Sequence, residues 1–175
     1  MKSDGPLKRL KPITIGLIHH TFAALHQQNN NKSNCLKRII YVAVFFLNRP
    51  GECSMTSGEP HPFRWCNIQL YMGQIQLDVF ETNAFQLCAA DWYGMTFTVQ
   101  KSGVPGEIVG HERSGAFYMC PAVGLAELCL FLIKHGAPYD APLGTYQKIS
   151  SGPLCYIKSS DIYKALKYPV RVHGA

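Results

Sequence analysis

The sequence lacks the apolar segments that are typical of membrane-spanning and of secreted proteins. Its longest uninterrupted apolar run, Ile39 to Leu47, has nine residues, far short of the roughly 20 that cross a bilayer. Residues 1–6 contain no apolar stretch typical of a signal peptide. We therefore expect an intracellular protein without a membrane span, nuclear if the host is eukaryotic and otherwise cytoplasmic.

Paired cysteines are also missing. The seven cysteines are odd in number, no two form a Cys-x-x-Cys pair, and they stand at positions 35, 53, 66, 88, 120, 129 and 155. This spacing favours ordinary buried thiols in a reducing compartment, and it gives neither a disulfide framework nor a zinc site. We expect no metal and no small-molecule cofactor.

The chain carries an excess of positive charge. Seventeen Lys and Arg face eleven Asp and Glu, a net charge of +6, which favours a polyanionic partner but is also common in proteins that bind none. We expect a basic extended arm over residues 1–12 and one domain over residues 13–175. Lys8, Arg9 and Lys11 of the arm are candidate contacts to nucleic acid, with a solvated tail as the alternative.

The first part of the domain predicts two helices. One is expected from Thr14 and a second over residues 36–47, because apolar side chains recur three and four positions apart in both. The polar stretch 27–32 between them is expected to be a loop, and Ser33 or Asn34 would cap the second helix. The aromatic and β-branched residues late in this segment would also suit a strand, but its length favours a helix.

The middle of the chain predicts a small antiparallel sheet. Residues 51–62 are rich in turn-forming residues. Beyond them, apolar and polar side chains alternate over 68–72, 75–79 and 95–100, with 107–109 as a return strand. Lys101 would then lie at the tip of the second hairpin.

The last part predicts two more helices. Pro121 opens a helix that Gly136 ends. The elements expected after it are a loop over 138–146, a short strand over 154–157 and a final helix over 159–167 that Pro169 ends. This order predicts a mostly helical α+β domain, with an antiparallel sheet of three to four strands on one side.

Three motifs stand in order along these elements. Residues 45–52 read Phe-Phe-Leu-Asn-Arg-Pro-Gly-Glu, 96–104 read Thr-Phe-Thr-Val-Gln-Lys-Ser-Gly-Val, and 110–115 read Gly-His-Glu-Arg-Ser-Gly. Together they resemble the tyrosine recombinase, or phage integrase-like, catalytic domain, in particular its Crypton-type eukaryotic mobile-element branch. The resemblance covers about residues 11–174. It implies that fold and a role in DNA integration or recombination, in which strands are broken and rejoined through a phosphotyrosine link.

The resemblance also assigns catalytic roles. Arg49 matches the family's first arginine, whose planar fork bonds two phosphate oxygens. Glu52 matches the acid that supports this arginine, and Lys101 matches the hairpin lysine that protonates the leaving 5′ oxygen. The alternatives are a surface ion pair between Arg49 and Glu52 and a solvated lysine.

Arg113 does not match the family's second arginine. The family has His-x-x-Arg after its final helix, whereas His111 and Arg113 form His-x-Arg and precede the Pro121 helix. Arg113 is therefore either a contact to the DNA backbone or a loop charge. The nucleophilic tyrosine has no matching position either, and we expect Tyr163 and Tyr168, which come too early, to be packing residues.

These observations predict a partial catalytic domain that is inactive alone. It would bind double-stranded DNA, and self-associate on it in a complete enzyme. A non-catalytic DNA-binding module, or a degenerate interaction remnant of the same fold, is the alternative.

Overall fold

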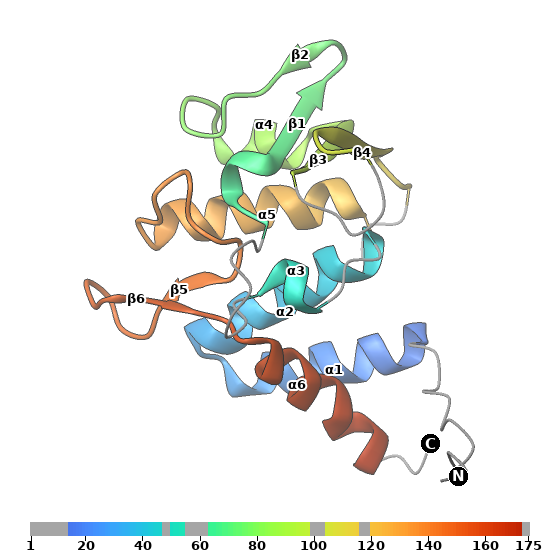
Figure 1. Ribbon diagram of the computed structural model, residues 1–175, viewed down its shortest axis with the longest axis vertical. Helices are drawn as coiled ribbons and strands as arrows, with labels where there is room; N and C mark the ends of the chain where they lie inside the picture. Colours follow the sequence, from blue (N-terminus) through green and yellow to red (C-terminus); the bar gives the residue numbers. More distant parts are fainter. Residues whose placement is uncertain (1–13, 47–49, 55–62, 99–103, 116–119, 173–175) are drawn as a thin grey trace, which may run out of the picture.

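The computed structural model describes residues 14–46, 50–54, 63–98, 104–115 and 120–172. Its helices are α1 (Ile15–Gln28), α2 (Asn31–Phe45), α3 (Pro50–Cys53), α4 (Ala84–Cys88), α5 (Pro121–Lys134) and α6 (Ser159–Val172) (Figure 1). The 3-10 turn η1 spans Trp65–Asn67, and the strands are β1 (Ile68–Met72), β2 (Ile75–Gln76), β3 (Trp92–Phe97), β4 (Glu107–Glu112), β5 (Thr145–Gln147) and β6 (Leu154–Tyr156). The predicted α+β class is confirmed.

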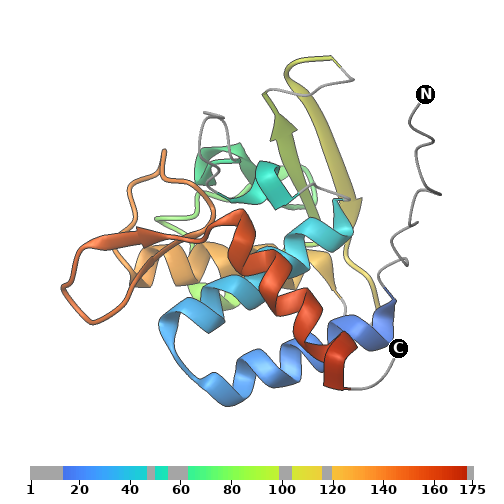
Figure 2. The same cartoon turned by 60° about the horizontal axis from the view of Figure 1, so that its bottom comes forward.

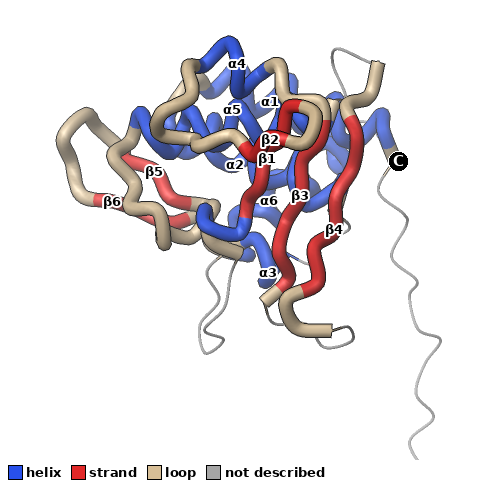
Figure 3. Tube along the Cα trace, turned by 90° about the horizontal axis from the view of Figure 1, so that it is seen from above, coloured by secondary structure: helices blue, strands red, loops and turns tan. Residues whose placement is uncertain are grey.

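Four strands form one antiparallel sheet in the order β2-β1-β3-β4. The first hairpin turns at Gly73, whose positive φ of 58° suits a residue without a Cβ. In the second hairpin, Gly94 pairs with Gly110 and Phe97 with Glu107. Figure 3 shows this sheet beside the helices and the separate β5-β6 pair away from it.

The helices are layered beneath the sheet. α5 contacts β1, β3 and β4 on one side and α2 on the other, while α1 and α6 contact each other and α2 (Figures 1 and 2). Leu125, Leu128 and Leu132 form the predicted apolar stripe of α5 and are almost completely buried. The core is therefore continuous from the sheet to the two terminal helices.

The start of α2 corrects the predicted loop and cap. Asn30, rather than Ser33 or Asn34, is the N-cap: its side chain accepts from the Ser33 N–H at 2.9 Å, and the Ser33 hydroxyl accepts from the Asn30 N–H at 3.2 Å. This capping box satisfies two backbone donors at once, so the helix begins inside the predicted loop 27–32.

Other boundaries also differ from the predictions. α4 was not predicted, α3 overlaps the start of the supposed turn segment 51–62, and β5 begins inside the expected loop 138–146. β2 ends at Gln76, earlier than expected. α6 continues past Pro169 to Val172, because a proline removes only one backbone donor and here stands in the last turn of an otherwise continuous helix.

Over the ranges that the structure describes, none of the helices combines the length and apolar character needed to cross a bilayer.

Candidate functional site

Most of the predicted site residues lie outside the described residues. These are Arg49, Lys101, Lys8, Arg9 and Lys11. Glu52 and Arg113 are described, and so are the residues that border positions 47–49 and 99–103. The candidate site is therefore described through the residues that support the segments 47–49 and 99–103.

Those supports contact β3 at two positions, Tyr93 and Phe97. The Phe46 ring, next after α2, lies edge-on to the Tyr93 ring of β3 with centroids 5.6 Å apart. The Glu52 carbonyl of α3 accepts a 2.7 Å hydrogen bond from the Phe63 N–H. The Phe63 ring in turn lies edge-on to Phe97, at 4.7 Å. We name these residues, Phe46, Glu52, Phe63, Tyr93 and Phe97, the α2–β3 junction.

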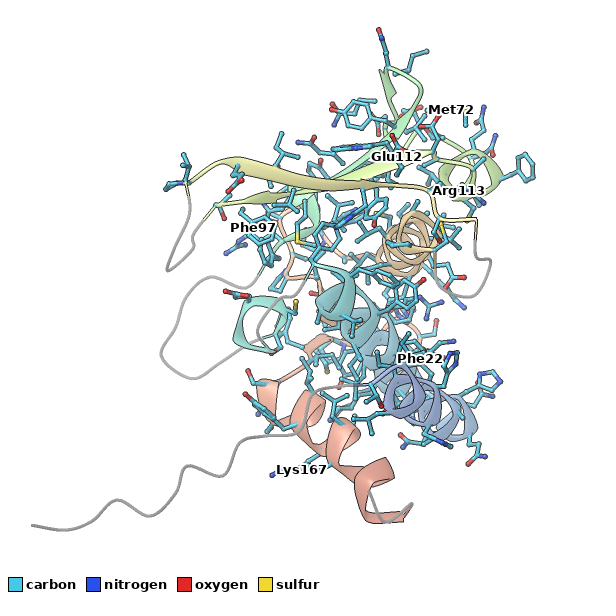
Figure 4. The ribbon with its side chains drawn as sticks, turned by 90° about the vertical axis from the view of Figure 1, so that its right-hand side faces the viewer. Phe22, Met72, Phe97, Glu112, Arg113 and Lys167 are labelled. Atoms are coloured by element: carbon cyan, nitrogen blue, oxygen red, sulfur yellow. The ribbon has the colours of Figure 1, made fainter. Side chains whose placement is uncertain are left out.

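The junction is rigidly supported. Phe46, Phe63, Tyr93 and Phe97 are all buried, and Glu52 is half-buried. Edge-to-face aromatic pairs of this kind stabilise beyond the area they bury, by about 0.5–1.5 kcal/mol each. Figure 4 shows Phe97 at the end of β3 that lies toward α3. The chain on either side of positions 47–49, and the start of the second hairpin's turn, therefore share one support.

The first turn of α6 also reaches α3. The Ser54 hydroxyl, one residue past α3, lies 3.0 Å from the Ser159 hydroxyl at the start of α6. Ser54 is buried, so this hydrogen bond is shielded from water. No periodic pattern in the sequence indicates the Ser54 contact, or the one between Phe63 and Phe97, because both join residues that are far apart in the chain.

Arg113 lies far from the Phe97 part of the junction but close to its Phe46–Tyr93 part. β4 begins opposite Phe97 and ends opposite Trp92, so Arg113 follows the end of β4 that is roughly 20 Å from Phe97 at about 3.3 Å per residue. Two residues before Arg113, His111 pairs with Tyr93, and its ring lies 5.5 Å from the Phe46 ring. Figure 4 shows the two ends, with Phe97 at one and Glu112 and Arg113 at the other.

Arg113 has a structural role where it lies. Its guanidinium Nη1 donates to the Cys88 carbonyl at 2.7 Å and to the Ala90 carbonyl at 3.3 Å. A cation at the C-terminal end of a helix satisfies carbonyls that lack helical partners, and here that helix is α4. The predicted contact with DNA stays a prediction, and it would use a side chain that is exposed but already engaged.

Tyr163 corrects the expectation that it is a packing residue. Its side chain is 53% exposed on α6, so it does not form part of the core. A residue in the first turns of an amphipathic helix can face solvent even when it is aromatic. The side chain of Tyr168 lies outside the described residues.

Four of the seven thiols, Cys35, Cys53, Cys120 and Cys129, are buried. Cys120 is the N-cap residue of α5. Burial opposes its ionisation, but hydrogen bonds from the Val123 and Ala122 N–H groups and from Ser114 lower the pKa of the thiol. Because the side chain is almost fully buried, we interpret Cys120 as part of the helix start.

Charge is divided unevenly along the chain. Between Arg64 and Lys101 the sequence contains no Lys or Arg, but it contains Asp78, Glu81 and Asp91. A surface for a polyanion must therefore be built from other parts of the molecule. In the described part of the chain, no group of three or more His, Cys, Asp or Glu side chains is placed to hold a metal ion.

No protein family, curated protein or solved structure matches the chain.

Proposed function

We propose that the chain is the DNA-binding part of a tyrosine-recombinase-like catalytic domain, acting in DNA recombination or integration. The observation that carries the proposal is the α2–β3 junction. It joins the supports of the two segments that hold Arg49 and Lys101, the residues that the three sequence motifs single out. An arginine and a lysine attached to neighbouring supports are suited to hold one phosphodiester from two sides.

Each residue has a distinct role in this proposal. Arg49 bonds the non-bridging oxygens of the scissile phosphate, where negative charge develops during transfer. Glu52 orients the arginine and does not itself carry the proton, because a free carboxylate would repel the phosphate. Loss of the arginine clamp should cost roughly 3–4 kcal/mol of transition-state stabilisation, by analogy with a lost oxyanion donor.

The covalent step is proposed as follows. A tyrosine oxygen forms a bond to phosphorus as the bond from phosphorus to the 5′ oxygen breaks, and Lys101 donates a proton to that leaving oxygen. The tyrosine hydroxyl loses its own proton to water, so that one proton leaves the nucleophile as one reaches the leaving oxygen. The nucleophile and the second arginine match no position in this sequence, so we propose that this chain alone binds DNA without cutting it.

DNA binding is the first property to test. Fluorescence anisotropy with a labelled duplex, repeated over a salt series, should give an affinity that falls steeply with salt, because phosphate contacts release counterions. Arg49→Ala and Lys101→Ala should each weaken binding and lower the salt slope by about one. Lys148→Ala removes an exposed charge from the β5–β6 connection, and it is the matched control.

Two outcomes would contradict the proposal. One is absent or salt-insensitive binding. The other is an equal loss of affinity in all three variants, since this would reduce the site to a general effect of net charge.

Incubation with a nicked suicide substrate tests the covalent step separately. We expect no covalent protein–DNA adduct from this chain, and an adduct from a longer chain that also supplies a His-x-x-Arg motif and a tyrosine. An adduct from the 175 residues alone would show that a nucleophile lies within them.

A second candidate function is that of a non-catalytic interaction module of the same fold. It is favoured by large apolar side chains that face solvent on β2, α4 and the segment between them: Ile75 is 72% exposed, Phe80 55% and Phe85 83%. Such side chains gather on surfaces that bind other proteins. Salt-dependent DNA binding that is lost in Arg49→Ala would decide for the first candidate.

A further inference from the structure

The surface most distinct from the candidate site is an acidic lobe, which we define as residues 65–91. It comprises η1, β1, β2 and α4, and it forms the end of the molecule above α5 in Figure 1. It contains three acidic residues and none of the seventeen Lys and Arg. In a chain of net charge +6, this lobe is the region least suited to nucleic acid and best suited to a cation.

The lobe borders an apolar groove. The groove has a volume of about 460 Å³, and Leu77, Val79, Phe80 and Tyr139 line it. The rings of Phe80 and Tyr139 lie 5.6 Å apart, and both rest on Trp65, at 4.9 and 5.7 Å. Trp65 is fully buried, whereas Phe80 and Tyr139 are about half exposed. The groove therefore has a fixed floor and accessible walls.

A carboxylate is held at the lip of the groove. Asp78 also lines the groove, and its Oδ1 accepts a 2.8 Å hydrogen bond from the Phe80 N–H. A second acid, Glu81, directly follows Phe80 and is exposed. Neither acid forms an ion pair within the described ranges. Arg64, a cation on the Tyr139 side of the groove, is instead paired with Asp140: its Nη1 lies 3.9 Å from the Asp140 carboxylate and donates to the Asp140 carbonyl at 2.6 Å.

We propose that this groove binds the amino-terminal segment 2–12 of a second copy of the chain. The segment reads Lys-Ser-Asp-Gly-Pro-Leu-Lys-Arg-Leu-Lys-Pro. Leu7 and Leu10 would enter the groove beside the paired rings of Phe80 and Tyr139, and the cations around them would face Asp78 and Glu81. Contact with a phosphate backbone would not bury the two leucine side chains, whereas an apolar groove would remove their apolar surface from water.

The position of α1 favours a second copy over the same copy. Segment 2–12 leads into α1, which lies on the far side of α5 and α2 from β1, β2 and α4 in Figure 1. Reciprocal exchange of arms between two copies gives a closed dimer, and insertion of each arm into the next copy gives a ring or a filament. Since the same cations are proposed to contact DNA, one arm would serve one partner at a time.

A labelled peptide of residues 1–13 tests the docking directly. Its anisotropy is measured against the full-length chain at low salt, in the absence of DNA, so the result does not depend on the proposed recombinase role. Binding should saturate. The double variant Asp78→Asn, Glu81→Gln should weaken it by at least about fivefold, as two partly exposed ion pairs are lost. The amide introduced by Asp78→Asn keeps an acceptor oxygen for the Phe80 N–H, so the lip of the groove should retain its shape.

The matched control is Glu107→Gln, Glu112→Gln, which removes the same charge from β4 and should leave binding within about twofold. A peptide carrying Leu7→Ser and Leu10→Ser should also bind more weakly, because the apolar contact is lost. No saturable binding, or equal weakening by the groove and control variants, would overturn the proposal.

Self-association distinguishes the second copy from the same copy. Sedimentation velocity of the full chain should show species larger than a monomer as concentration rises, and excess unlabelled peptide should dissociate them. A monomer at all concentrations, together with peptide binding only after residues 1–12 are deleted, would place the arm on its own molecule and refute the exchange.

Discussion

The two ends of β3 differ in packing. At its Phe97 end the Phe63–Phe97 contact of the α2–β3 junction is dry and aromatic, and the chain beyond it leads to Lys101. At its Trp92 end the strand directly follows the acidic lobe, which has exposed apolar side chains and carboxylates. Arg113 and the Phe46–Tyr93 contact also lie toward this second end. Net charge alone hides how unevenly charge is placed along the chain, because +6 is one sum over all 175 residues.

The largest expected effect comes from breaking the junction. Phe63→Ala should lower the free energy of unfolding by about 3–5 kcal/mol, because Phe63 is 5% exposed and its ring fills the space beside Phe97. Phe85→Ala, in the lobe, should change it by no more than about 0.5 kcal/mol, since Phe85 is 83% exposed. Urea denaturation measures both, and equal losses would remove the structural contrast between the two ends.

A smaller effect is expected in the hairpin of β3 and β4, where Trp92 packs on two glycines. The Trp92 ring lies across the paired glycines Gly94 and Gly110, and a Cβ added at Gly110 would overlap it. Gly110→Ala should therefore cost about 1–3 kcal/mol through overpacking. Gly115→Ala is the control, because a Cβ there meets no atom within 4 Å. A thermal shift no larger than that of the control would show that the ring moves aside freely.

Acidic pH should lower the free energy of unfolding through His135, which caps the end of α5. Burial lowers the pKa of His135 from its ordinary 6.5, and the charges of Lys134 and Arg38 lower it further, although Gln147 acts in the opposite direction. The folded state therefore resists protonation. Stability should be full above pH 6.5 and should fall as the pH drops below that value, because the unfolded chain binds the proton more readily.

His135→Gln tests this assignment, because glutamine does not titrate. The variant should flatten the fall in unfolding free energy between neutral and mildly acidic pH. An unchanged pH profile would assign the acid sensitivity to other groups.

The smallest effect is expected at the ion pair that joins α2 to α6. Lys32 Nζ lies 2.8 Å from Asp161 Oδ1, with the lysine side chain 45% exposed, and Asp161 Oδ2 accepts from the Lys158 N–H at 3.0 Å. Burial alone would raise the pKa of Asp161, but these hydrogen bonds and the nearby lysines lower it. Stability from this group is therefore present above the ordinary value of 3.8 and lost as the pH falls through the lowered pKa.

Asp161→Asn should cost about 0.5–1 kcal/mol at neutral pH, as expected for a partly exposed ion pair. Neither DNA affinity nor peptide binding should change, because Asp161 lies apart from the junction and the groove. A loss of either would show that the two ends depend on how α6 docks against α2.

Prediction succeeded where a local pattern was long. Alternation found β1 and the last part of β3, β4 was expected as the return strand of the same hairpin, and the apolar stripe with Pro121 and Gly136 found α5. It failed where an element was short, as in α4 with five residues, although Asn83 and Gln86 form the cap that could have marked it. The start of α2 was misplaced because several neighbouring polar residues are all plausible caps.

The candidate site was predictable only in part. Its residue types were visible in sequence, and the bonds that support them were not, because Glu52 with Phe63 and Phe63 with Phe97 are contacts between different elements. The role of Arg113 at the end of α4 was also invisible, since α4 itself was not predicted.

The sequence by itself determined the α+β class, the central strands and helices, and the absence of positive charge between Arg64 and Lys101. These follow from composition and from periodicity over neighbouring residues. Only the tertiary structure decided that the ends of α2 and β3 meet, and that Phe80 and Tyr139 form a groove over Trp65. Such contacts join residues far apart in the chain, and they exist only once the whole core has formed.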